Sequence, residues 1–121
     1  MVKEWEKAFP VATKFDIANA KSKLESYVDD KMKVEDFNEN PPETEEQRII
    51  NDILIKKTRY IERAVKQIRN QEVKRIIEYR YIQGRSHAET VIRFSLYCDR
   101  TVDRKIELGI KSVANTLLYL E

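Results

Sequence analysis

The 121-residue sequence contains very little cysteine, histidine, glycine or proline. Because Cys98 is the single cysteine, the chain forms no internal disulfide. The sequence also has a single histidine, His87, and one residue of each type is too few for a zinc cluster. So little cysteine suits a reducing compartment, and we expect a cytoplasmic protein. No apolar run approaches the roughly 18 residues of a membrane span. The first residues also lack the apolar core of a secretory signal, so we expect no contact with a membrane.

Few helix breakers remain in the chain, which has only two glycines and three prolines. Charged residues make up 36% of the sequence and hydrophobic residues 41%. This combination is typical of soluble, mostly helical proteins. No strand pattern or internal repeat competes with the helical one. The sequence therefore predicts an all-α fold of one domain, or of one domain with an appendage.

The N-terminal part is predicted to hold one helix, over residues 11–34, after a short stretch that Pro10 closes. Its apolar residues recur at spacings near three and four: Phe15, Ala18, Leu24, Val28 and Met32. The next segment, DFNENPPE at residues 36–43, combines acids, asparagines and prolines and is predicted to be a linker. Residues 1–43 are thus expected to form a helical segment with an acidic linker, ahead of a second helical domain at 44–121.

A long central helix is predicted over residues 45–69. Thr44 and Gln47 fit a capping box at its start. An apolar stripe follows: Ile49, Ile50, Ile53, Leu54, Ile61, Ala64, Val65 and Ile68. The stripe is longer than a C-terminal unit of about 50 residues can cover. Either the 11–34 helix or a second subunit would cover the rest.

Three shorter predictions complete the chain. A break at residues 69–71 precedes a helix over 71–82, which Gly84 ends because glycine tolerates the left-handed conformation. Ser86 then caps a short helix over 87–94. After a turn at Ser95–Cys98, Asp99 caps a final helix that ends near residue 120. The last two helices and their turn have the lengths of a helix-turn-helix, at about residues 86–120.

The final helix has two contrasting faces at 100° per residue. Its predicted buried stripe is Val102, Ile106, Gly109, Ile110, Val113 and Leu117. Its opposite side presents Arg100, Thr101, Arg104, Leu108 and Lys111. A helix with a basic outer face in its first turns suits the major groove of DNA, where base edges and phosphates both lie within reach.

Charge is distributed unevenly along the chain. Residues 1–46 carry 7 basic and 12 acidic residues, a net charge of −5, whereas residues 47–121 carry 16 and 9, a net charge of +7. The second part is therefore where a polyanion would bind. Arg85, Ser86 and His87 start the short helix, whose backbone amides and hydroxyl suit a phosphate.

The C-terminal residues also resemble a known family. The run at residues 75–118 is RIIEYRYIQGRSHAETVIRFSLYCDRTVDRKIELGIKSVANTLL. The features that carry the resemblance are Tyr79-Arg80-Tyr81, Ser86, Glu89, Thr101-Val102, Arg104-Lys105, Ile110 and Val113-Ala114, with the upstream segment IERAVKQI at 61–68. This run is similar to region four of bacterial sigma factors, and more closely to the phage-encoded ArpU/RinA family of transcriptional regulators. The turn between Glu89 and Thr101 is one residue longer than the usual sigma-like spacing, and Ser95 stands at its usual glycine position.

The resemblance implies a transcriptional regulator of phage or prophage late genes that binds duplex DNA through this helix-turn-helix. We expect it to activate these genes. The DNA contacts we expect are Arg85, Ser86, His87, Arg100, Thr101, Arg104, Lys105 and Lys111. Contact with host RNA polymerase is a further expectation, because sigma region four touches both promoter and polymerase. A homodimer is another, since two half-sites multiply specificity.

Two alternatives of other classes stay open. One is a phage terminase small subunit, which packages DNA as a ring of subunits. The other is a module that acts on RNA polymerase alone. We do not expect an enzyme, a cofactor or a metal site, because the sequence has no nucleophile with a base, no glycine-rich phosphate loop and no ligand cluster.

Overall fold

The computed structural model describes residues 11–94 and 99–121. The predicted turn at Ser95–Cys98, the capping side chain of Asp99 and the stretch up to Pro10 lie outside the described residues. Within the described ranges every regular element is a helix and no strand occurs. The prediction of an all-α fold is confirmed.

Six α-helices and one π-helical turn make up the described chain. They are α2 (Lys14–Glu25), α3 (Tyr27–Glu39), α4 (Glu45–Lys66), α5 (Gln71–Ile77), η1 (Glu78–Ile82), α6 (His87–Arg93) and α7 (Asp99–Leu120). From α4 onward these bounds lie within a few residues of the predicted ones. Local capping explains part of the agreement, because side chains that bind free amides mark where helices begin.

Two of the predicted caps form. The Ser86 hydroxyl accepts a hydrogen bond from the Glu89 amide at 3.1 Å, and the Glu89 carboxylate accepts one from the Ser86 amide at 3.2 Å. The Thr44 hydroxyl likewise accepts from the Gln47 amide at 3.1 Å. The predicted capping box at Thr44 is only half present, however, because the Gln47 side chain accepts from the Glu43 amide at 2.8 Å instead.

The single helix predicted over residues 11–34 is wrong. The chain breaks at Ser26, and α2 packs on α7 while α3 packs on α4. The predicted apolar stripe is wrong in part for the same reason: Phe15 and Met32 are 78% and 62% exposed, whereas Leu24 is buried. Lys57 of α4 stabilises the break between α2 and α3, because its Nζ lies 2.8 Å from Asp30 Oδ2 and 3.0 Å from Ser26 Oγ.

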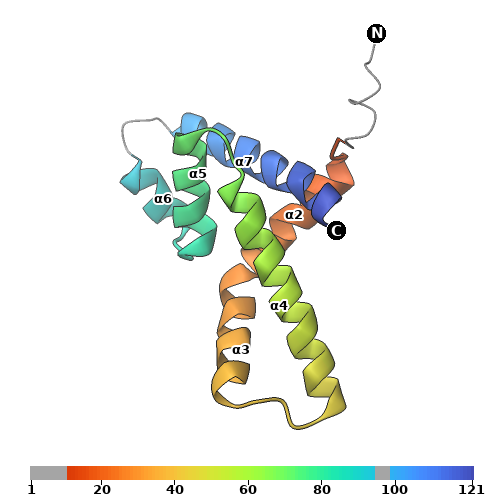
Figure 1. The fold of residues 1–121 in the computed structure, drawn as a ribbon. Coiled ribbons are helices and arrows are strands. Elements are labelled where there is room, and N and C mark those ends of the chain that lie inside the picture. Colours follow the sequence, from red (N-terminus) through yellow and green to blue (C-terminus); the bar gives the residue numbers. More distant parts are fainter. Residues whose placement is uncertain (1–10, 95–98) are drawn as a thin grey trace.

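The predicted linker at residues 36–43 is also shorter than expected. Helix α3 continues to Glu39, so the connection to α4 is the segment 40–44, which contains both adjacent prolines. The two helices run side by side as a hairpin that projects from the rest of the molecule, with the connection at its tip (Figure 1). One buried cluster nevertheless joins Ala20, Leu24 and Tyr27 to residues of α4, α5, η1 and α7.

The C-terminal helices pack around α7. Helix α5 packs against α7, and η1 contacts α6. Gly84 follows η1 with φ +75°, so the predicted left-handed glycine is confirmed, and Val28 Cγ2 would lie 2.8 Å from a β-carbon there. Gly109 lets α7 approach α5, because a β-carbon there would lie 2.3 Å from Ile77 Cγ1.

Candidate nucleic-acid interface

One face of α7 is anchored in the core. All six residues of the predicted stripe are buried: Val102, Ile106, Gly109, Ile110, Val113 and Leu117. Helices α2, α4 and α5 pack around this face. The rotation of α7 about its axis is therefore set by buried contacts, and the direction of its outer side chains follows from that rotation.

The opposite face of α7 forms an exposed basic ridge, which we define as Arg100, Arg104, Leu108 and Lys111. All four residues are exposed, with Leu108 at 52%. None of the three cations forms an ion pair with another residue in the described part of the chain. Thr101 lies at the edge of the ridge and is half-buried. Within the part of the chain that the structure describes, the positive charge of the ridge is thus not neutralised by an ion pair.

Lys105 points elsewhere, although it lies on the same helix. Its ammonium forms an ion pair with Glu72 of α5, and only 18% of its side chain is exposed. This pairing ties α7 sideways to α5. Of the expected DNA contacts on α7, Lys105 is the one that the structure turns away from the ridge.

Helix α2 adds two cations that sequence reasoning did not include. Lys14 and Lys21 line a groove of about 430 Å³ between α2 and α7, together with Arg104 and Lys111. Glu107 is the one acid among the groove's lining residues. Helix α2 packs on α7 (Figure 1), and just before α2 begins, Ala12 N donates to Asn115 Oδ1 of α7 at 2.8 Å. The spacing of seven between the two lysines, which puts them on one face of a helix, is the signal that could have found them.

The proposed phosphate contacts at residues 85–87 have partners within the protein. Arg85 lies 3.6 Å from Glu89, and the Ser86 hydroxyl caps α6. The pKa of Glu89 is lowered, first by the hydrogen bond from the Ser86 backbone and then by that from its side chain. A charged carboxylate therefore occupies the start of α6, where a phosphate would otherwise meet free amides.

His87 connects α6 to α7. Its Nε2 lies 2.5 Å from Asp103 Oδ1 on α7, and both side chains are about half exposed, at 53%. The contact joins the first turn of α6 to the second turn of α7. It gives His87 a role in holding the two helices together.

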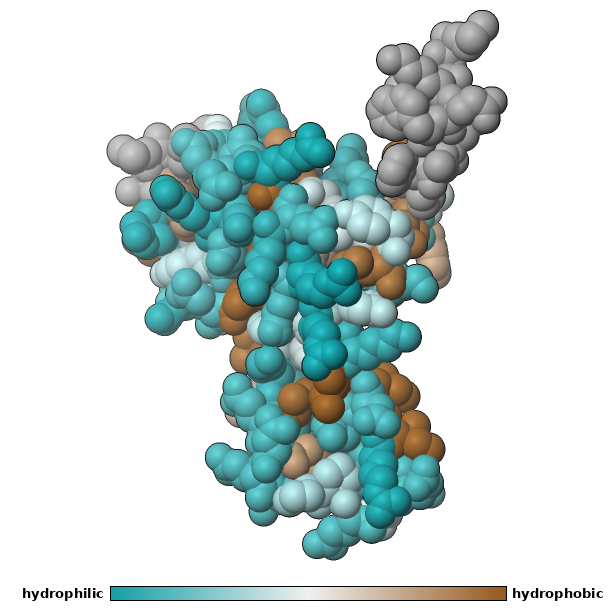
Figure 2. All heavy atoms as spheres, viewed as in Figure 1, coloured by the Kyte–Doolittle hydropathy of each residue, from teal (hydrophilic) through white to brown (hydrophobic). Residues whose placement is uncertain are grey.

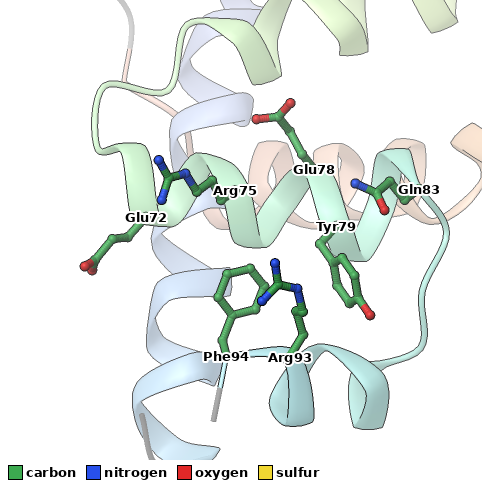
Figure 3. Close-up of a pocket in the computed structure, with 7 residues that line it drawn as sticks. All are labelled: Glu72, Arg75, Glu78, Tyr79, Gln83, Arg93 and Phe94. Carbon is green, nitrogen blue, oxygen red and sulfur yellow. The ribbon is translucent and has the colours of Figure 1, made fainter. Parts of the chain in front are cut away.

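A pocket of about 490 Å³ lies between α5, η1 and α6 (Figure 3). In Figure 3 the Arg93 and Phe94 side chains extend from the end of α6 toward α5 and η1, and the Tyr79 ring meets Phe94 edge-on at 5.9 Å and 84°. Glu72, Arg75, Glu78 and Gln83 complete the lining. Charges of both signs surround this pocket, so its chemistry favours no particular ion. Its aromatic contact serves to pack α6 on η1.

No helix among the described residues is long and apolar enough to cross a membrane. Within the same residues no group of three or more histidine, cysteine, aspartate or glutamate side chains is arranged to hold a metal ion. Comparisons with protein-family models, with curated proteins and with solved structures find no match for this chain.

Proposed function

We propose that this chain binds duplex DNA by inserting the N-terminal half of α7 into the major groove. The observation that carries the proposal is the basic ridge: three exposed cations that form no ion pair with another described residue, on a helix whose other face is buried. Exposed, unpaired cations suit phosphates because binding releases condensed counterions.

The dimensions of the ridge support this mode of binding. Lys111 lies eleven positions after Arg100, which corresponds to about 16 Å along a helix. The major groove is about 12 Å wide and accepts a single helix. In this pose Arg100, Thr101 and Arg104 reach base edges from the first turns of α7. Lys14 and Lys21 of α2 then contact the phosphates along one side of the groove.

The biological role we propose follows from the family resemblance. A helix-turn-helix of the ArpU/RinA type would make this chain a transcriptional regulator of phage or prophage genes. The pairing of Arg85 with Glu89 and of His87 with Asp103 argues that α7 and α2 supply most of the affinity, and the start of α6 less.

Salt-dependent binding tests the proposed surface. We expect Arg104→Ala to weaken binding to a random duplex of about 30 base pairs and to lower the slope of log K against log salt by about 0.9. At about 0.1 M salt this change corresponds to roughly an eightfold loss of affinity. Lys14→Ala and Lys21→Ala should each produce a change of similar size, measured by fluorescence anisotropy.

Arg59→Ala is the matched control. Arg59 is an exposed arginine on α4, so this substitution removes the same charge as Arg104→Ala but outside the proposed DNA-binding surface. Its salt slope should equal that of the unmodified protein. If Arg104→Ala and Arg59→Ala have the same slope, the DNA-binding face has been assigned wrongly. Selection of duplexes from a random pool then shows which base pairs the first turns of α7 read.

A further inference from the structure

The first half of α4 carries an apolar surface that no other described part of the protein covers. Ile49, Ile50 and Ile53 are 50%, 50% and 59% exposed, although their periodicity predicts burial. Helix α3 packs on α4, and Thr58 and Ile61 of α4 are buried, whereas these isoleucines of its first half are not. Figure 2 shows hydrophobic surface on the projecting half of the molecule, where α3 and α4 form the hairpin. Three exposed isoleucines within five residues are typical of a contact surface.

A groove continues this surface toward the body of the protein. It has a volume of about 310 Å³ and is lined by Ile53, Tyr60 and Leu117, with charged side chains at its rim. Lys56 Nζ lies 5.6 Å and the Arg63 guanidinium 5.9 Å from the centre of the Tyr60 ring. The isoleucine surface and the groove are thus continuous through Ile53, and basic side chains border the groove end.

Charge along α4 indicates which partner fits. The isoleucine end begins with the exposed Glu45 and Glu46, of which Glu45 also lies 3.1 Å from Arg48 of the same helix, while Lys56 and Arg63 border the other end. Two copies of α4 in antiparallel order bring the acids of each beside the bases of the other. Parallel order would bring like charges together. The helix dipoles also favour the antiparallel order.

We propose that two copies of this chain pair through α4 in antiparallel order about a two-fold axis at Ile53. With a rise of 1.5 Å per residue, Glu45 then lies within about 3 Å, along the axis, of Arg63 in the second copy. Ile49 of each copy reaches the groove of the other between Ile53 and Tyr60. The contact is isologous and closes at two subunits. This proposed pairing does not depend on whether the chain binds DNA.

Sedimentation equilibrium of the full chain tests the pairing. We expect a dimer, and we expect Ile53→Glu to weaken it at least about a hundredfold, because two carboxylates would meet at the axis where two isoleucines were buried. Since Ile53 is exposed, circular dichroism should show an unchanged helical fold. Ile92→Glu is the matched control: Ile92 is 73% exposed on α6, and this variant should remain dimeric.

A charge exchange tests the order of the helices. Glu45→Lys should weaken the dimer about tenfold, and adding Arg63→Glu should restore it, because the exchange recreates both opposite-charge pairs. Cysteine pairs provide a geometric readout in a Cys98→Ser background. Ile53→Cys should form an intersubunit disulfide at the axis. Ile49→Cys should not, because its two copies lie about 12 Å apart along the helices.

Several results would overturn the proposal. A monomer at every concentration up to about 0.1 mM would do so, as would a dimer that Ile53→Glu leaves intact. Disulfides at both positions would indicate parallel helices. A ring of more than two subunits would contradict the two-fold pairing and would favour the packaging-protein alternative.

Discussion

The contact between α5 and α7 depends on Gly109, and adding one methyl group there tests how tightly the two helices are packed. In Gly109→Ala the new β-carbon would lie 2.3 Å from Ile77 Cγ1, 2.6 Å from Ile77 Cδ1 and 3.1 Å from Val73 Cγ1. Favourable carbon contacts lie at about 3.5–4.0 Å. Ile77 is 0% exposed, so its side chain has no solvent to move into. We expect α7 to be pushed away from α5.

The expected cost is the difference between two opposing effects. Overpacking a core costs roughly 1–3 kcal/mol, and the close approach to a fully buried side chain puts this site near the upper end. Alanine is better than glycine in a helix interior by about 1 kcal/mol. The free energy of unfolding should therefore fall by about 2 kcal/mol. For a domain of this size the melting temperature should fall by roughly 8 °C.

Urea and thermal unfolding followed by circular dichroism measure this change, and a second substitution isolates its cause. Ile77→Ala removes Cγ1 and Cδ1 of Ile77, the two atoms that would lie closest to the new methyl group. In that background Gly109→Ala should stabilise the protein by about 1 kcal/mol, the helix propensity alone. If Gly109→Ala stabilises the otherwise unmodified protein, or destabilises it equally in both backgrounds, the argument from close packing is refuted.

Two further predictions concern titration. Hydrogen bonds from Ser86 lower the pKa of Glu89 below its ordinary 4.5, so the stabilisation by the charged Glu89 is present above pH 4.5 and is lost as the pH falls through the pKa of the folded state. Glu89→Gln should therefore reduce the dependence of the free energy of unfolding on pH in the acid range. An unchanged pH dependence would contradict the role of Glu89 in capping α6. Burial first, and then the charge of Glu62, raise the pKa of Tyr27 from 10.0 to about 12. The resulting stabilisation is present below pH 10 and is lost as the pH rises toward 12. Absorbance titration should show a late phenol that Tyr27→Phe removes, and an early titration of every tyrosine would contradict this burial.

Most helix ends could be predicted from the sequence because their signals are local. Asn70 accepts hydrogen bonds from the Glu72 and Val73 amides, and Ser86 caps α6 in the same way. Such bonds span two or three residues, so they depend little on the rest of the fold. The basic ridge was predictable for a related reason, since helix geometry alone separates it from the buried stripe.

The break at Ser26 had no comparable signal. No glycine or proline occurs between Val11 and Glu39, and the apolar spacing continues through the break. Lys57 and Asp30, on two different helices, form the ion pair beside it. An interaction that joins residues 27 positions apart becomes visible only when the chain is folded. The predicted stripe that included Phe15 and Met32 failed for this reason.

The sequence by itself determined the helices from Thr44 onward, the buried and exposed faces of α7, and the excess of positive charge in the second part of the chain. Helix period, capping chemistry and composition are properties of neighbouring residues, and these are what a sequence states directly. Tertiary structure alone decided that Lys14 and Lys21 lie beside Arg104, that Lys105 pairs with Glu72, and that three isoleucines of α4 remain uncovered. Each of these depends on which helices pack together, and packing is set by the shape and charge of distant residues.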